Sequence, residues 1–247
     1  MFNNLTKFGD YIFLLYKTFS RPDRWSEFFR RYIDEIYKLG IDSVAIVITI
    51  SLFIGAVISI QTQMNITSPF IPSYTVGLLT RETILLEFSS TIMALILAGK
   101  VGSSISSEIG TMRVTEQIDA LDIMGVNSAN YLILPKITAL VTFIPILVII
   151  SMFTGLTGGY LVGVFMDIFP VSRYTYGLQT YFQEFYVWYS IIKSLFFGFV
   201  ISSVASYYGY SVKGGAAEVG KASTDAVVVS SVSILLLDVL LTKLLLQ

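Results

Sequence analysis

Apolar and polar positions divide the chain into an amphipathic N-terminal part and five long apolar runs. Apolar residues over 2–20 and 25–37 recur at spacings of three and four, with basic residues between them. This periodicity predicts two amphipathic helices within residues 1–40 that lie in a membrane interface. They would be separated at Arg21-Pro22-Asp23, because proline disfavours helix for the residue before it. A solvated basic face beside the first membrane span is the alternative for the same pattern.

The five apolar runs each hold about 20 residues or more, the length that an α-helix needs to cross a bilayer. Their approximate limits are 41–63, 78–101, 134–165, 185–207 and 222–241. The predicted fold class is an all-α polytopic membrane protein, with residues 41–247 forming one five-helix domain after the interfacial helices. The third run ends in small residues at every fourth position, which favour close helix packing: Gly155, Gly159 and Gly163.

A polar segment from Lys100 to Val126 interrupts the apolar pattern between the second and third runs. Its charged side chains are concentrated within little more than a dozen residues: Glu108, Arg113, Glu116, Asp119 and Asp122. Such a segment must leave the hydrocarbon, because charges are costly there. It holds more organised sequence than a tether needs, so we interpret residues 104–124 or thereabouts as a helical surface element.

Helical periodicity predicts a bend within this polar segment. On one straight helix, Ile105 and Ile109 would lie on one side, whereas Ile118 and Leu121 would lie roughly opposite. We therefore expect a break near Gly110, between the end of a spanning helix and a short surface helix. The surface helix would have one apolar and one acidic side, which suits docking on a cytosolic protein.

Basic residues predict the orientation of the five spans, because Lys and Arg are enriched on the cytoplasmic side. The side shared by the N-terminus, the polar segment and the 207–222 connection carries twelve of them: Lys7, Lys17, Arg21, Arg24, Arg30, Arg31, Lys38, Lys100, Arg113, Lys136, Lys213 and Lys221. The other side carries only Arg81, Arg173 and Lys243, and Lys193 is ambiguous. We expect the N-terminus and the surface helix in the cytoplasm and the C-terminus outside.

Composition argues against several classes of chemistry. The chain has no histidine and no cysteine, which removes disulfides, thiol nucleophiles, histidine-dependent triads and ordinary zinc sites. A formal net charge of -1 gives no nucleic-acid signal. The sequence GAAEVGK at 215–221 fits the start of a phosphate loop, but Ala222 stands where Ser or Thr would hold magnesium. We interpret it as a glycine turn between spans, and we expect no catalytic residue, no metal site and no enzyme activity.

Two carboxylates lie within the second apolar run. Arg81 and Glu82 open the run, and Glu87 lies further in. A carboxylate at mid-bilayer costs about 2.5–3.5 kcal/mol on insertion scales, so it usually faces protein or a cavity. Arg81 and Glu82 could also form an interfacial pair, and nearby hydroxyls could satisfy Glu87. A stand-alone secondary transporter or channel that uses Glu82 and Glu87 is therefore one hypothesis, although no internal repeat supports it.

Three blocks of this sequence resemble the MlaE/YrbE permeases of MCE-type ABC transporters. They are Arg81-Glu82, then Ala98-Gly-Lys-Val-Gly102 with the segment from Glu108 through Gly125, and GGAAEVGKAST at 214–224. The resemblance covers most of the chain from the first span onward. The departures from the family pattern are Lys100 for arginine, Thr83-Ile84 for Leu-Gly, a missing proline at Ile84-Leu85, and Asn127-Ser128 for Asp-Pro.

The resemblance implies the permease subunit of a transporter that moves phospholipid between the inner and outer membranes of a bacterium. A cytoplasmic coupling helix would bind an ATPase through Glu108, Thr111, Arg113, Glu116, Gln117 and Asp119. A lipid cavity would be lined by Val57, Gln61, Met64, Leu78, Arg81 and Glu82. The departures leave the shape of that cavity, and hence the cargo lipid, open.

The resemblance also implies partners. They are a second copy of the chain in the inner membrane, an MlaF-like ABC ATPase that holds ATP and magnesium, a periplasmic MlaD-like MCE protein and, through the ATPase, an MlaB-like STAS-domain protein. The chain itself would bind no cofactor. A scaffold whose charged helix only recruits partners is a third hypothesis. The transport hypothesis predicts that charge reversal at Glu108 or Arg113 uncouples the ATPase and abolishes lipid transport.

Overall fold

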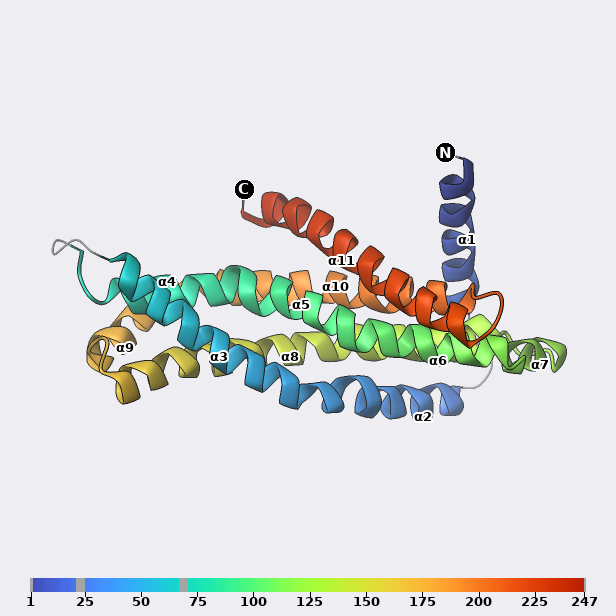
Figure 1. The fold of residues 1–247 in the computed structure, drawn as a ribbon, viewed down its shortest axis with the longest axis horizontal. Coiled ribbons are helices and arrows are strands. Elements are labelled where there is room, and N and C mark those ends of the chain that lie inside the picture. Colours follow the sequence, from blue (N-terminus) through green and yellow to red (C-terminus); the bar gives the residue numbers. More distant parts are fainter. Residues whose placement is uncertain (1, 21–24, 67–70, 247) are drawn as a thin grey trace. The chain divides into compact units, whose positions relative to one another are not determined.

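A computed structural model describes residues 2–20, 25–66 and 71–246, which form helices joined by short connections (Figure 1). The α-helices are α1 (Phe2–Thr18), α2 (Trp25–Glu35), α3 (Asp42–Asn65), α4 (Thr75–Thr83), α5 (Met93–Leu97), α6 (Ser103–Val114), α7 (Gln117–Ile123), α8 (Ser128–Met166), α9 (Val171–Gln179), α10 (Glu184–Tyr210) and α11 (Ala216–Leu246). Three segments have the wider turns of a π-helix: η1 (Ile36–Ile41), η2 (Ile84–Ile92) and η3 (Ala98–Gly102).

Five helical runs among the described residues are long and apolar enough to cross a membrane. They are Trp25–Asn65, Thr75–Val114, Ser128–Met166, Glu184–Tyr210 and Ala216–Leu246. Each contains one of the five runs predicted from the sequence, which confirms an all-α polytopic membrane protein. The helices are longer than the predicted spans because backbone hydrogen bonding continues past the point where the side chains stop being apolar.

The second amphipathic helix is not separated from the first span. α2 passes through η1 into α3, so Trp25–Asn65 is one helical run. Gly40 lies inside this run, where an added Cβ would overlap the ring of Phe143. The hydropathy of the sequence changes near residue 40, but the helical backbone continues through this point without a break. The predicted break at Arg21-Pro22-Asp23 lies outside the described residues.

The described chain divides into two compact units, each built from segments distant in sequence. The first unit combines the residues up to Asp42 with Ala94–Phe143 and with the chain from Leu195 onward. The second unit combines Ser43–Met93 with Ile144–Ser194. The polar segment between the second and third spans belongs to the first unit, and Glu82 and Glu87 of the second span belong to the second.

Small residues bring helices into close contact in the second unit. A Cβ added at Gly55 of α3 would overlap the carbonyl oxygen of Gly155 of α8, so this contact requires glycine. One helical turn away, the Ser51 hydroxyl donates to the Ser151 hydroxyl at 2.8 Å. These contacts identify α3 as a helix that packs on the glycine motif of α8. Added Cβ atoms at the other two motif glycines, Gly159 and Gly163, would meet side chains of the same unit.

The polar, aromatic-rich connection between the third and fourth spans contains the short helix α9. Tyr174 of α9 is buried, and its hydroxyl donates to the carbonyl of Leu156 at 3.2 Å. Burial raises the pKa of Tyr174 to about 12, so this hydroxyl keeps its proton. Gly177 of α9 approaches the backbone of Tyr74, and Gly77 of α4 approaches the backbone of Tyr174. α9 is thus a packed element that periodicity alone missed, because its aromatic residues resemble an interfacial loop.

In the first unit, α6 packs against α10 and α11. A Cβ at Gly209 of α10 would lie 2.7 Å from the carbonyl oxygen of Ser106. The Ser223 hydroxyl of α11 donates to the carbonyl of Ser103 at 3.1 Å. Ile105 and Ile109 of α6 are fully buried. The helix that leads to the charged segment is therefore held on its apolar side by the chain itself.

Candidate functional site

The charged segment forms two helices, and the break between them is not at Gly110. α6 runs unbroken through Gly110 to Val114, and the chain turns at Thr115 and Glu116. Glu116 has a left-handed backbone with φ 60° and ψ 13°. An added Cβ at Gly110 would lie 3.1 Å from Val219. The predicted bend near Gly110 is wrong because this glycine serves close packing against α11 rather than a turn.

The short helix α7 has a well-defined C-terminal end. Gly125 has φ +78°, and its amide donates to the carbonyl of Asp122 at 3.0 Å. The amide of Val126 donates to the carbonyl of Leu121, also at 3.0 Å. These two bonds and the left-handed glycine form a Schellman motif, which satisfies carbonyls that a helix end leaves free. The Asp122 carboxylate also accepts the amide of Ser128 at 3.3 Å, which ties α7 to the start of α8.

α7 presents most of its surface to the surroundings. Ile118 is fully buried and anchors the helix on the first unit. Glu116, Gln117 and Asp119 are exposed, in agreement with an acidic side. The apolar side chains at the C-terminal end are also exposed, with Ile123 at 86% and Met124 at 68%. The exposed surface of α7 is therefore acidic along the helix and apolar at its end.

Arg113 joins the two helices of this segment. Its guanidinium donates to the Asp119 carboxylate at 2.7 Å and lies 5.7 Å from the ring of Tyr210. The other predicted coupling residues make local bonds. The hydroxyl of Thr111 donates to the carbonyl of Ser107 at 2.8 Å, and the amide of Gln117 donates to the Thr115 hydroxyl at 3.0 Å. The Arg113–Asp119 pair hence links α6 to α7, while Thr111 bonds within α6 and Gln117 bonds at the start of α7.

Glu108 belongs to an ion network rather than to the exposed surface of α7. The ammonium of Lys136 on α8 lies 2.9 Å from Glu108 of α6 and 2.6 Å from Glu35 of α2. Lys136 is only 2% exposed, and Glu35 is 12% exposed. Lys38 approaches Glu108 at 3.8 Å from the solvent side. The sequence placed Glu108 with the ATPase-contacting residues, whereas the structure places it between α2, α6 and α8.

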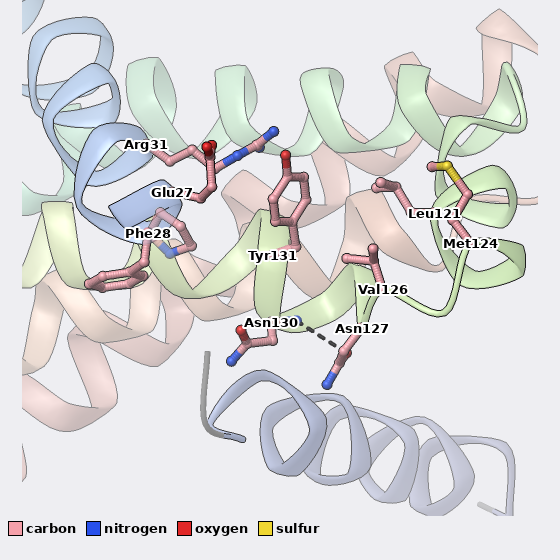
Figure 2. A pocket seen from close by; sticks show the side chains of 10 residues that line it. Glu27, Phe28, Arg31, Leu121, Met124, Val126, Asn127, Asn130 and Tyr131 are labelled. Atoms are coloured by element: carbon pink, nitrogen blue, oxygen red, sulfur yellow. Dashed lines mark hydrogen bonds between the residues drawn. The ribbon is translucent and has the colours of Figure 1, made fainter. Parts of the chain in front are cut away.

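A cavity of about 580 Å³ lies beside α7 in the first unit. Figure 2 shows Glu27 and Arg31 of α2 next to Tyr131 of α8, with Leu121 of α7 and Met124, the residue that follows this helix, also lining the cavity. The Arg31 guanidinium lies 3.5 Å from the centre of the Tyr131 ring, a cation–π contact. The cavity combines a charged wall with an apolar wall.

Two asparagines at the start of α8 hold the end of α1. The Asn127 amide donates to the carbonyl of Lys17 at 3.0 Å and to the Ser20 hydroxyl at 2.9 Å. The Asn130 amide donates to the carbonyls of Thr18 at 2.8 Å and Ser20 at 2.6 Å. Aspartate has no amide to donate, so the Asp-Pro common in the resembling family could not make the contacts of Asn127.

The second unit holds the residues predicted to contact lipid. Val57, Gln61 and Met64 follow one another along α3 and are all exposed, with Val57 at 48% and Met64 at 72%. Spacings of four and three place them on one side of the helix. Leu78 and Glu82 are half-buried on α4, and their spacing of four residues likewise places them on one side of that helix. The second unit therefore has an exposed stripe on α3 and a half-buried stripe on α4.

Arg81 was predicted with this set, but its side chain has another environment. It is 1% exposed, and its guanidinium donates at 2.8 Å to the carbonyls of both Leu178 and Thr180. A longer bond of 3.4 Å reaches the carbonyl of Tyr181. Glu82 lies 3.6 Å away. Arg81 therefore stabilises the C-terminal end of α9, where free carbonyls favour a cation.

The Glu87 carboxylate lies next to a buried cation, Lys193, whose partner is not evident from the sequence. The Lys193 ammonium is fully buried and lies 3.3 Å from the Glu87 carboxylate, which is 45% exposed. Lys193 also contacts the Tyr189 hydroxyl at 3.1 Å. The Thr91 hydroxyl donates to the same carboxylate at 3.2 Å, as the neighbouring hydroxyls suggested. Both carboxylates of the second run thus lie next to a basic side chain.

The segment that resembled a phosphate loop is mostly helical. Residues 216–221 form the first turns of α11, and the bend lies at Gly214, with φ +126°, and Gly215. The interpretation of GAAEVGK as a glycine turn is therefore wrong for residues 216–221, because the turn ends at Gly215.

Sequence reasoning missed three residues of these sites. The sequence gives Lys136 a role in orientation only, leaves the side of Lys193 ambiguous and does not single out Ile123. A signal existed for the first two, because a lysine within an apolar run needs a partner. For Ile123 the signal was its position directly after an acidic stretch and directly before the Met-Gly pair that ends the helix.

Comparison with known proteins shows similarity over most of the chain. The family profile described as Permease MlaE matches residues 32–244. A probable ABC transporter permease protein of Rickettsia bellii is 37% identical over 88% of this chain and 83% of its own length. One of Synechocystis sp. is 32% identical over 88% of this chain and 82% of its own length. The intermembrane phospholipid transport system permease protein MlaE of Haemophilus influenzae is 29% identical over 93% of this chain and 88% of its own length.

Proposed function

Because this chain belongs to the MlaE permease family, we propose that it is the membrane permease subunit of an ABC transporter for phospholipids. The observation that carries the proposal is α7, a short helix anchored by Ile118 that exposes an acidic side and an apolar end. A permease that makes no use of ATP itself needs such a surface to receive force from an ATPase. We propose that ATP and magnesium bind in that partner and that this chain binds no cofactor.

The proposed contact surface is narrower than the set expected from sequence. Glu116, Gln117, Asp119 and the apolar end at Ile123 are exposed and available to an ATPase. Glu108 and Arg113 of α6 stabilise that surface through ion pairs. Glu108 pairs with Lys136 of α8, and Arg113 pairs with Asp119 of α7. Movement imposed on α7 would thereby reach α6, and through the ion network also α2 and α8.

The proposed lipid path uses the exposed stripe of α3. Val57 and Met64 offer apolar surface, and Gln61 places one polar group among them. A phospholipid needs this combination, because its chains are apolar and its glycerol region carries hydrogen-bond acceptors. We propose that a second copy of the chain completes the path, since an exposed stripe on one copy cannot enclose a lipid alone. Glu82 and Leu78 would contribute from α4.

We further propose that α7 and the N-terminus are cytoplasmic and the C-terminus periplasmic, with an MCE-domain protein on the periplasmic side and a STAS-domain protein bound through the ATPase. The distribution of basic residues supports this orientation. The absence of cysteine makes the test simple, because single cysteines can be placed in an otherwise thiol-free chain. In intact cells, a membrane-impermeant thiol reagent should label Ile71→Cys and leave Ile123→Cys unlabelled.

The function is tested by a charge placed at the exposed end of α7. Ile123→Glu changes a side chain that is 86% exposed, so the fold should persist while the ATPase is lost on purification and phospholipid transport stops. The matched control is Ile71→Glu, an exposed isoleucine of the connection between α3 and α4, which should retain both. Reversal of Glu108 or Arg113 should also uncouple, but these changes break internal ion pairs as well. Full transport by Ile123→Glu, with the ATPase still bound, would refute α7 as the docking helix.

A further inference from the structure

The first unit contains a cationic cavity that the proposed transport path does not use. It measures about 430 Å³ and lies between α1, the end of α6 and the end of α10 with the residues that follow it. Three basic side chains from three segments line it: Lys17, Arg113 and Lys213. Asp10 is the one carboxylate in its wall among the described residues. The cavity therefore carries an excess of positive charge.

The walls of this cavity also provide neutral donors and apolar contacts. Tyr207, Tyr210 and Ser211 line it with polar side chains, of which the Tyr210 hydroxyl also bonds the Ser128 hydroxyl at 2.9 Å, and Phe13 and Val212 contribute apolar surface. Cations together with hydroxyl donors suit a phosphate group, which accepts several hydrogen bonds at once. Arg113 keeps donors free for such a group, since it contacts Asp119 through one nitrogen and a guanidinium has five N–H bonds.

A second cavity of about 350 Å³ shares the wall formed by Tyr207. Like the first, it lies between α1 and α10, and residues of α11 also line it. Its lining is mainly apolar, with Phe8, Val200, Val204 and Val229. α1 is fixed to this region of α10, because Tyr11 bonds Ser203 at 2.9 Å and packs edge-on against Tyr207 at 5.6 Å. A cationic cavity and an apolar cavity thus meet at one tyrosine.

We propose that these two cavities together bind one anionic glycerophospholipid of the surrounding membrane. Its phosphate would lie among Lys17, Arg113 and Lys213, and one acyl chain would follow the apolar cavity past Val204. The apolar half selects a lipid over a soluble phosphate, because a free anion gains nothing from Phe8 and the valines. The cationic half selects an anionic over a zwitterionic lipid, because the latter adds its own positive charge to the three already present.

The site would link membrane charge to α7. The guanidinium of Arg113 that faces the cationic cavity also holds Asp119 of α7 at 2.7 Å. A bound phosphate would order the Arg113 side chain and with it the direction of α7. This lipid is resident and is not the cargo, and its binding holds whether or not the chain transports phospholipid.

The test uses the purified full-length chain and native mass spectrometry. Phosphatidylglycerol and phosphatidylcholine with the same acyl chains are titrated, and the dissociation constant of each is measured. The wild type should bind phosphatidylglycerol at one tight site per chain. Lys17→Gln with Lys213→Gln should weaken it about 30-fold, from the loss of two cations near a membrane surface, and leave phosphatidylcholine unchanged. The control Lys221→Gln removes an exposed lysine of α11 outside both cavities and should have no effect.

A second pair of variants tests the apolar half without changing charge. Val204→Phe should fill the tail cavity and weaken phosphatidylglycerol about tenfold or more, while Val228→Phe, at an exposed position of α11 outside the cavity, should not. Equal affinity of wild type and the double glutamine variant for phosphatidylglycerol would overturn the proposal. So would displacement of the lipid by millimolar inorganic phosphate with no effect of Val204→Phe, because the site would then take a soluble anion. Parallel loss of both lipids in the glutamine variant would also count against it, since charge selectivity would be missing.

Discussion

Each of the two units contains a buried contact of a different kind. In the second unit, helix backbones touch at glycines such as Gly55 and Gly155, and small hydroxyls such as Ser51 and Ser151 bond across the contact. In the first unit, long charged side chains meet at Lys136, a lysine that is only 2% exposed. Backbone contact at glycine has one arrangement only, whereas an ion network can exchange partners. The Lys136 network of the first unit can therefore rearrange in a way that the Gly55–Gly155 contact of the second unit cannot.

The largest effect should come from removing the centre of the ion network. Lys136→Met leaves Glu35 and Glu108 without their shared cation, and breaking a buried pair in this way costs about 3–5 kcal/mol. Thermal unfolding of the purified chain in mild detergent measures it. Lys38→Met, at a lysine 62% exposed and 3.8 Å from Glu108, is the control and should cost less than about 1 kcal/mol. Similar losses in both variants would mean that burial of Lys136 has no role in the first unit.

The next effect should come from the glycine contact of the second unit. Gly155→Leu forces a branched side chain against Ile84 and the backbone of Ser51, and overpacking of this kind costs about 1–3 kcal/mol. The yield of monodisperse protein on size-exclusion chromatography should fall. Gly220→Leu, in α11 where an added Cβ meets open space, should behave as the wild type. If Gly155→Leu is tolerated as well as Gly220→Leu, the close approach of α3 and α8 is not required.

A smaller effect tests the ion pair of the second unit. Glu87→Gln removes the carboxylate next to buried Lys193, but Tyr189 and the carbonyl of Leu86 still accept from this lysine, so we expect a loss of about 1–2 kcal/mol. Glu82→Gln should cost less, since Arg81 keeps its three carbonyl acceptors. A double-mutant cycle with Lys193→Met measures the coupling. A coupling of zero would show that the two side chains are neighbours without being partners.

The smallest effect concerns the end of α7. Gly125→Ala places a Cβ in a left-handed backbone with φ +78°, which costs about 1 kcal/mol. Gly220→Ala replaces an exposed helical glycine and should stabilise the chain by about 0.5–1 kcal/mol. The two substitutions are chemically identical and should shift the unfolding temperature in opposite directions. Shifts of the same sign would show that the Schellman motif does not need glycine.

The sequence predicts the spans and the charged segment, because both depend on composition along the chain. The five apolar runs and the exposed acidic residues of α7 lie where their hydropathy and charge require. The prediction of a break near Gly110 is wrong because a glycine can serve either a turn or a close helix contact. Only the nearby position of Val219 distinguishes these two roles.

Partnerships between distant residues could not be predicted from one sequence. Lys136 and Glu35 are 101 residues apart, and Arg81 and Leu178 are 97 apart. Nothing in local periodicity connects them. The coupling role expected of Glu108 and the cavity role expected of Arg81 came from the family resemblance, whereas the structure gives both side chains internal partners.

The fastening of α1 has a consequence for biosynthesis. The asparagines that hold its end follow about 110 residues later, and Ser203, which bonds Tyr11, follows 192 residues later. At about 5–20 residues per second, a ribosome needs about 10–40 s to synthesise the 192 residues from Tyr11 to Ser203. Until about 110 residues have followed, α1 has no fastening on α8, and until 192 have followed it has none on α10, so its own affinity for the lipid surface must first retain it. The amphipathic pattern of α1 is therefore a requirement of assembly as well as of the finished protein.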